Sequence, residues 1–201
     1  MIRVPPGRAG QVWIRRRLET ARRGIDILAR KQRLLAVERE LREPQTAAAL
    51  TAWTDACAEA ELWCARALRI GHEHQIPMVA AHLDAPASIT VDWRNVMAVS
   101  IPESARCEFP DLALASASGG SSATDRAVDA LADAVEKAAA HATVQRALVN
   151  IDAELLQTRR RLRLLERRRL PQLMRALGES SERLEQSERE DTLRLRWARR
   201  G

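Results

Sequence analysis

The sequence contains very few aromatic side chains: no Tyr, one Phe and five Trp, or 3% of its 201 residues. Compact globular cores usually draw much of their buried area from aromatic rings. Apolar residues still make up 46% of the chain and charged residues 30%. A core must therefore be built from Leu, Ala, Val and Ile, and this composition favours long helices or a coiled coil over a compact globule.

Cysteines and long apolar runs are also scarce. Cys57, Cys64 and Cys107 are an odd number with no CxxC motif, which argues against a disulfide framework or a zinc site. Cys57 and Cys64 are two turns apart on one helix face, too far to bridge, and we expect small buried residues in a reducing cytoplasm. No apolar run is long enough to span a membrane, and the start MIRVPPGRAG has no secretory signal pattern.

Motifs for catalysis or cofactor binding are missing from the sequence. Gly119–Ser122 lacks the Gly-Lys-Ser/Thr that completes a phosphate-binding loop, and no Gly-x-Ser-x-Gly motif occurs. His72 and His74 are not spaced as HExxH and would point in different directions on a helix, so we expect surface histidines. His82 and His141 have no identifiable partner. We therefore expect no catalytic, cofactor-binding or metal-binding residues, and a mechanical or binding role instead of an enzyme.

The charge is unevenly distributed along the chain. Residues 1–43 hold 12 Lys and Arg and 5 acidic residues, and residues 159–201 hold 14 and 7. Residues 44–158 hold 7 and 15. Both ends of the sequence are basic and the middle is acidic. If the chain folds back on itself, the folded molecule has one basic end and one acidic end, and we expect these ends to bind different partners.

The N-terminal segment has the 3/4 spacing of a coiled-coil seam, with Gln32 as the polar member. Its apolar seam residues are Ile14, Leu18, Ala21, Ile25, Leu28 and Leu35. Pro5 and Pro6 mark the expected helix start, and Pro44 is expected to interrupt the helix. The helix is then expected to resume, until Gly71, with a seam of Leu50, Trp53, Cys57, Ala60, Cys64 and Ala67.

The C-terminal segment is expected to begin after a Gly/Ser stretch, with Thr124 or Asp125 as its N-cap. Its early apolar face consists of Val128, Val135, Ala142 and Val149. The seam then continues through Leu148, Ile151, Leu155, Thr158, Leu162 and Leu165. Near Arg169 and Leu170, beside Pro171, it slips by one residue, which predicts a kink or phase adjustment. It continues as Leu170, Met174, Leu177, Ser181, Leu184, Glu188, Asp191 and Leu195.

Between these segments, residues 89–101 alternate between apolar and polar side chains, which predicts a short β-hairpin. A helix over residues 125–199 would be roughly 110 Å long, too long for a 200-residue globule, so it must pair with the first segment. We therefore predict an all-α fold, a long antiparallel two-stranded coiled-coil hairpin. Its parts are an N-terminal shaft helix (1–71), a middle region with the β-hairpin and linker (72–122) and a C-terminal shaft helix (123–201).

Three stretches resemble the D subunit of V-type and archaeal-type (A-type) ATPases. The opening is similar in Pro6, Arg8, Arg23-Gly24, the triplet Asp26-Ile27-Leu28 and Lys31. The ending is similar in Arg160-Arg161, Leu165-Glu166, Leu170-Pro171, Leu184-Glu185 and the Glu188–Glu190 run. NVMAVSIP, from Asn95 to Pro102, is similar to the family's hairpin segment, where Ala98 replaces an expected Gly. Arg163 stands where the family tends to carry Asn.

The resemblance implies the central rotor shaft of a bacterial V/A-type ATPase, transporting H⁺ or Na⁺, that is cytoplasmic and peripheral to the cell membrane. Its implied partners are catalytic A and nucleotide-binding B subunits, a small F subunit and the funnel-like subunit on the membrane rotor ring. It implies no cofactor, nucleic acid or membrane insertion. The seam and a basic tip facing the hexamer, made of Arg8, Arg194, Arg196, Arg199 and Arg200, are the expected functional residues.

A nucleic-acid-binding coiled coil is the alternative, because arginine runs bind phosphate well. Against it, the basic residues lie on the same heptads that pair, not on a separate arm, and the acidic middle would repel a phosphate backbone. A general scaffold protein is a further alternative, and it predicts self-association.

Overall fold

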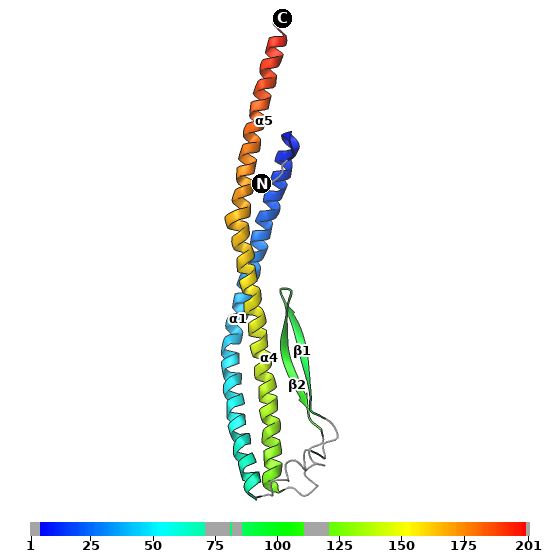
Figure 1. The fold of residues 1–201 in the computed structure, drawn as a ribbon, viewed down its shortest axis with the longest axis vertical. Coiled ribbons are helices and arrows are strands. Elements are labelled where there is room, and N and C mark those ends of the chain that lie inside the picture. The colour runs from blue at the N-terminus through cyan, green and yellow to red at the C-terminus, as the bar shows by residue number, and fades with distance from the viewer. Residues whose placement is uncertain (1–4, 71–80, 82–85, 111–120, 200–201) are drawn as a thin grey trace. The chain divides into compact units, whose positions relative to one another are not determined.

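The computed structural model describes residues 5–70, 81, 86–110 and 121–199. Its elements are α1 (Gly7–Ile70), β1 (Ser88–Val96), β2 (Val99–Glu108), α4 (Ser122–Leu164), the π-helix η1 (Leu165–Arg169) and α5 (Leu170–Ala198) (Figure 1). The predicted fold class, long N- and C-terminal helices around a small β-hairpin, is confirmed. His72, His74, His82 and most of the Gly/Ser stretch lie outside the described residues.

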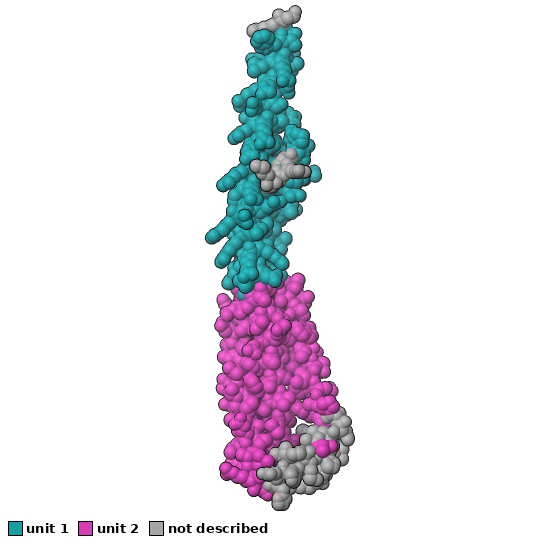
Figure 2. Space-filling view, viewed as in Figure 1, with its two compact units in different colours: residues 1–34, 155–201 teal, residues 35–154 magenta. Residues whose placement is uncertain are grey.

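The chain divides into two compact units (Figure 2). We call residues 1–34 and 155–201 the terminal unit, and residues 35–154 the middle unit. The terminal unit contains the first part of α1, the end of α4, η1 and α5. The middle unit contains the rest of α1, the hairpin and most of α4.

Helix α1 runs through Pro44 without a break, so the expected interruption there is wrong. Buried and half-buried side chains recur every three or four residues along the whole helix: Ile14, Leu18, Ala21, Ile25, Leu28, Gln32, Leu35, Arg39, Arg42, Thr46, Ala49, Trp53, Ala56, Ala60, Trp63 and Ala67. Pro44 falls on the opposite, exposed face. Water can therefore hydrogen-bond the Glu40 carbonyl that Pro44 leaves unpaired, and the helix continues.

In the terminal unit, α1 packs antiparallel to α4, η1 and α5. Ile14, Leu18 and Ala21 form a buried cluster with Leu173, edged by Leu170 and Leu177 among others. Leu155 is also buried, and a further six predicted seam residues are half-buried: Ile25, Leu28, Leu162, Leu165, Leu177 and Leu184. The predicted seam positions Glu188, Asp191 and Leu195 are wrong, because all three are exposed. Near the start of α1, Gln11 Nε2 donates a hydrogen bond to Ser181 Oγ at 3.3 Å. Residues with higher numbers in α1 contact residues with lower numbers in α5, as expected for an antiparallel pair of helices.

In the middle unit the two helices meet through alanine. Ala56 and Ala60 pack on Ala134, and Ala67 packs on Ala123 and Ala127. The predicted apolar face of Val128, Val135, Ala142 and Val149 is wrong, because Val135 and Val149 are 38% and 52% exposed. The buried residues Ala127 and Ala134 each lie one position before a predicted residue of this face. Small side chains are favoured there because they let the two helices approach closely.

The same unit gives His141 a partner that the sequence did not reveal. His141 is buried, and its ring stacks on Trp53 of α1 with centroids 5.4 Å apart. Arg39 adds a polar link between the helices: its Nε donates to Asp152 Oδ1 at 2.8 Å, and it also pairs with Glu43. The hydrogen bond to Asp152, and secondly that to Glu43, raises the pKa of Arg39.

The start of α4 differs from the prediction. The helix begins at Ser122, and the backbone N–H of Thr124 donates to Ser121 Oγ at 3.3 Å. Ser121 is therefore the residue that caps this end. The predicted caps, Thr124 and Asp125, are wrong because they lie inside the first turn, where Thr124 is buried.

The π-helix η1 occurs where the sequence predicts a slip of the seam, and this prediction is confirmed. The N–H of Leu170 bonds to the carbonyl of Leu165, the i→i+5 pattern that accommodates one extra residue. After η1 the buried residue is Leu173, whereas Met174 is 54% exposed. The predicted seam position of Met174 is therefore wrong by one residue.

The hairpin pairs β1 with β2 antiparallel, from Ser88 opposite Glu108 to Val96 opposite Val99. A bulge follows Asp92, where Glu103 is the extra residue of β2. Met97 and Ala98 form the two-residue turn, and both have positive φ, 51° and 63°. This matches the turn type that fits the twist of the two strands.

Candidate coupling surfaces

The predicted basic tip is only partly assembled by the fold. Arg8 Nη2 is 2.8 Å from Glu188 Oε1 on α5, and this hydrogen bond, with its charge attraction, raises the pKa of Arg8. Arg194, Arg196 and Arg199 are exposed on α5, and Arg200 lies outside the described residues. Arg194 follows Glu188 by about 9 Å of helix. In the described residues Arg8 contacts α5 through Glu188, and Arg194, Arg196 and Arg199 lie further along the same helix.

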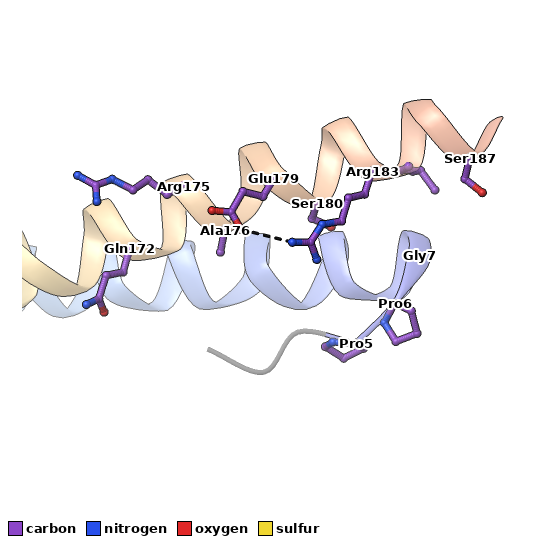
Figure 3. Close-up of a pocket in the computed structure, with 11 residues that line it drawn as sticks. Pro5, Pro6, Gly7, Gln172, Arg175, Ala176, Glu179, Ser180, Arg183 and Ser187 are labelled. Carbon is purple, nitrogen blue, oxygen red and sulfur yellow. Dashed lines mark ion pairs between the residues drawn. The ribbon is translucent and has the colours of Figure 1, made fainter. Parts of the chain in front are cut away.

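A groove of about 740 Å³ lies beside the start of α1 in the terminal unit (Figure 3). Pro5, Pro6 and Gly7 form one side, and polar side chains of α5 form the other. Within it Arg183 and Glu179 are paired at 3.8 Å. Gly7 has a φ of +71°, a conformation that suits glycine at the point where the chain turns into α1. The groove is lined by charged side chains and by apolar ones, among them Ala176 and Leu184.

The end of α5 carries exposed apolar side chains, of which the sequence reasoning selected only Leu195, as a seam residue. Leu193, Leu195 and Trp197 are 54%, 63% and 81% exposed. Leu193 and Trp197 are four residues apart, so they share a face of the helix. That spacing is the sequence signal that could have identified them. Together with the neighbouring arginines they form an end with both apolar and basic groups.

The hairpin is attached to the helices of the middle unit by a group of charged side chains. Glu38 on α1 pairs with Arg42 of the same helix at 2.8 Å and with Arg94 of β1 at 2.7 Å. Asn150 Nδ2 of α4 donates to the carbonyl of Ser100 at 3.1 Å. Sequence reasoning missed this group, although Arg42 occupies a seam position where a buried arginine needs a counter-charge.

Under β1 lies an open apolar groove of about 290 Å³. Ile89, Val91 and Trp93 line it from the strand, and Ala139 and Ala142 are among the α4 residues opposite. The strand residues alternate, so they share one face of β1. Each of the three is at least 36% exposed. This half of the hairpin is packed less tightly than the half near the turn.

No group of three or more His, Cys, Asp or Glu side chains in the part of the chain that the structure describes could hold a metal ion. Cys57, Cys64 and Cys107 are free and half-buried. No helix among the described residues is both long enough and apolar enough to span a bilayer.

The two units also differ strongly in charge. The terminal unit holds 24 Lys and Arg and 9 acidic residues, a net charge of +15. The middle unit holds 9 Lys and Arg and 18 acidic residues, a net charge of −9. Opposite charges on two units of one chain favour different partners for each.

Paired terminal helices, a docked hairpin and charged exposed ends define a helical-hairpin protein whose surfaces suit binding to other proteins. The chain belongs to the family of ATP synthase D subunits, whose model matches residues 12–200. It is 29% identical to the D subunit of the V-type ATP synthase of Thermus thermophilus over 98% of this chain and 87% of the relative. It is also 29% identical to the D subunit of the A-type ATP synthase of Halorubrum lacusprofundi, over 96% of this chain and 86% of that relative. The resemblance inferred from the sequence is thereby confirmed.

Proposed function

We propose that this chain is the central rotor shaft of a bacterial V/A-type ATPase that transports H⁺ or Na⁺. It transmits torque between a hexamer of catalytic A and nucleotide-binding B subunits and the membrane rotor ring, and it has no catalytic site of its own. The observation that carries the proposal is the family match over residues 12–200 in a chain whose first and last helices pair antiparallel.

The terminal unit is the part proposed to enter the hexamer. A subunit that transmits torque must resist twisting. Two helices packed along a buried apolar seam resist twisting better than a single helix does. The unit's charge of +15 supports contact with acidic surfaces of the surrounding subunits. Its outward-facing side chains are mostly charged, which limits adhesion while the shaft turns.

The middle unit is proposed to bind the small F subunit and the funnel-like subunit on the rotor ring. Its charge of −9 and its half-exposed apolar groove under β1 support partners different from those of the terminal unit. In this assembly the chain is cytoplasmic and peripheral to the membrane, without inserting into it.

Co-assembly tests the proposal most simply. The chain is co-expressed with A, B and F subunits of the same organism, and the complexes are separated by size and weighed by native mass spectrometry. We expect one copy of this chain, with one F subunit, per three A and three B subunits. Failure to join the hexamer would reject the shaft role. Self-association without A and B would support a scaffold, and tight salt-dependent binding of duplex DNA at physiological ionic strength would support the nucleic-acid alternative.

A further inference from the structure

The hairpin is joined to the helices of the middle unit by one carboxylate, that of Glu38, and by one neutral, exposed hydrogen bond from Asn150 Nδ2 of α4 to the Ser100 carbonyl. Glu38 Oε1 accepts hydrogen bonds from Arg94 Nη2 of β1 at 2.7 Å and from Arg42 Nε of α1 at 2.8 Å. The side chains of Glu38 and Arg42 are only 17% and 10% exposed, whereas that of Arg94 is 42% exposed. Water therefore screens the pair inside α1 weakly and reaches the pair between the strand and the helix more easily.

Both members of the Arg94–Glu38 pair have a second partner on their own side of the contact. Arg94 Nε lies 3.4 Å from Glu103 Oε1 on β2, and Glu38 keeps Arg42 on its own helix. Breaking a buried ion pair is strongly unfavourable mainly because it leaves a charge without a partner. Separation between Arg94 and Glu38 leaves none of these four side chains unpaired.

The hairpin is also held together by interactions of its own. Its two strands are paired from end to end, and Asp92 of β1 accepts hydrogen bonds from Ser104 at 2.9 Å and Arg106 at 3.3 Å on β2. The hydrogen bond from Ser104, and secondly the interaction with Arg106, lowers the pKa of Asp92. None of these interactions involves α1 or α4, so both strands can leave the helices together.

The buried apolar residues of the hairpin lie near its turn. Val99, Ile101 and Pro102 of β2 are buried, and Ile101 is 0% exposed. The apolar side chains Ile89, Val91 and Trp93 of β1, with Pro102 and Ala105 of β2, border the open groove against α4. Because these β1 side chains are already at least 36% exposed, separation must uncover mainly the buried residues of β2.

We propose that the hairpin is a detachable arm of the middle unit and that the Arg94–Glu38 ion pair is its latch. In the released arrangement Arg94 stays paired with Glu103, Glu38 stays paired with Arg42, and the α1–α4 pairing is unchanged. Release uncovers the buried apolar side chains of β2, namely Val99, Ile101 and Pro102. An acidic group of a binding partner that competes for Arg94 would open the latch.

Amide hydrogen exchange of the full isolated chain, read by mass spectrometry, tests this inference without any other subunit. Arg94→Gln removes the latch, and Arg106→Gln is the matched control because Arg106 pairs with Asp92 inside the hairpin. We expect Arg94→Gln to speed exchange in residues 94–102 by about tenfold, because loss of one charged hydrogen bond favours release and a two-stranded hairpin away from the helices frays readily. Peptides of α1 and α4 should exchange as in the unchanged chain. Arg106→Gln should alter residues 94–102 less than about twofold.

Salt provides a second readout of the same latch. Raising sodium chloride to about 1 M should speed exchange of residues 94–102 in the unchanged chain, because screening weakens the exposed part of the pair. It should have little further effect in Arg94→Gln. Equal effects of Arg94→Gln and Arg106→Gln would overturn the inference. A uniform rise in exchange across the hairpin, α1 and α4 would also overturn it, since the hairpin would then open only when the unit unfolds. These outcomes do not depend on the proposed rotor function.

Discussion

At the scale of single residues, the hairpin turn contains the two non-glycine residues with positive φ among those that the structure describes. Met97 and Ala98 have φ values of 51° and 63°, a region that side chains with a Cβ disfavour. The family resemblance leads us to expect glycine at position 98. A turn of this kind prefers Asn-Gly. The strain therefore arises because Met97 and Ala98 occupy the turn, and not because the turn type is unusual.

Ala98→Gly should relieve this strain and stabilise the hairpin by about 1 kcal/mol. Hydrogen exchange of residues 94–102 measures the effect. The matched control is Ala105→Gly, in the regular part of β2, which should destabilise the hairpin because glycine there only adds freedom to the unfolded chain. An equal loss of stability in both variants would contradict this account of the turn.

A second residue carries a buried hydroxyl with no partner. Thr158 is 0% exposed, and its Oγ1 has no hydrogen bond. Thr158→Val replaces the hydroxyl by a methyl group of similar size, so we expect the free energy of unfolding to rise by about 1 kcal/mol.

Thr143→Val is the control for this substitution, because the Thr143 hydroxyl donates to the Ala139 carbonyl at 2.7 Å. It should leave stability unchanged or lower it by up to about 1 kcal/mol. Urea unfolding of both variants gives the comparison. A loss of stability in Thr158→Val would mean that its hydroxyl does find a partner in solution.

Single residues are also where sequence reasoning was least reliable. It chose Val135 and Val149 for the helix interface because they are larger apolar residues, whereas the close approach of the helices selects Ala127 and Ala134. The stacking of His141 on Trp53 depends on which residues of two distant segments meet. Such a pairing cannot be read from either segment alone.

At the scale of elements, η1 accommodates one extra residue between the two halves of the C-terminal helix. Before it the seam passes Ile151, Leu155 and Leu162, and after it Leu173 is buried. Deleting Arg168 should turn η1 into ordinary α-helix and keep Leu173 against α1. We expect the melting temperature to change little and helix content to stay constant, as measured by circular dichroism.

A deletion inside regular helix gives the contrast. Removing Arg175 from α5 rotates everything beyond it by about 100°, which turns Leu177 and Leu184 away from α1. That deletion should lower the free energy of unfolding by at least about 2 kcal/mol. If both deletions lowered the free energy of unfolding equally, η1 would not be the element that keeps the apolar seam of α4 and α5 facing α1.

The elements themselves could largely be predicted from the sequence. Periodicity predicted both long helices, and alternation of residues 89–101 predicted the hairpin because its turn and bulge leave most of the alternation intact. The position of the slip at Arg169 and Leu170 also followed from spacing. The effect of Pro44 could not be predicted, because a proline ends a helix or is tolerated according to which face it occupies.

At the scale of the whole molecule, the unequal charges of the two units suggest how the chain couples to its partners. Changing Arg194, Arg196, Arg199 and Arg200 to Gln removes four positive charges from the expected hexamer-facing end. We expect the affinity for the A/B hexamer to fall by about tenfold and torque coupling to weaken, because charges at the edge of an interface act mainly on association. Biolayer interferometry at two salt concentrations measures the affinity.

The matched control is Arg183→Gln with Arg189→Gln, since each of these arginines pairs with a glutamate four residues earlier on α5. That variant should bind the hexamer within about threefold of the unchanged chain. Unchanged binding and unchanged ATP-driven rotation in the four-arginine variant would reject a role for the basic tip.

Rotation of single assembled complexes tests the central claim most directly. The hexamer is fixed to a surface, and a bead is attached to the middle unit through Glu61→Cys in a background without the native cysteines. Addition of ATP should turn the bead continuously in one direction, in steps of about a third of a turn that reflect the threefold hexamer. A bead that stays still or only fluctuates while the hexamer hydrolyses ATP would contradict the proposal that this chain is the shaft.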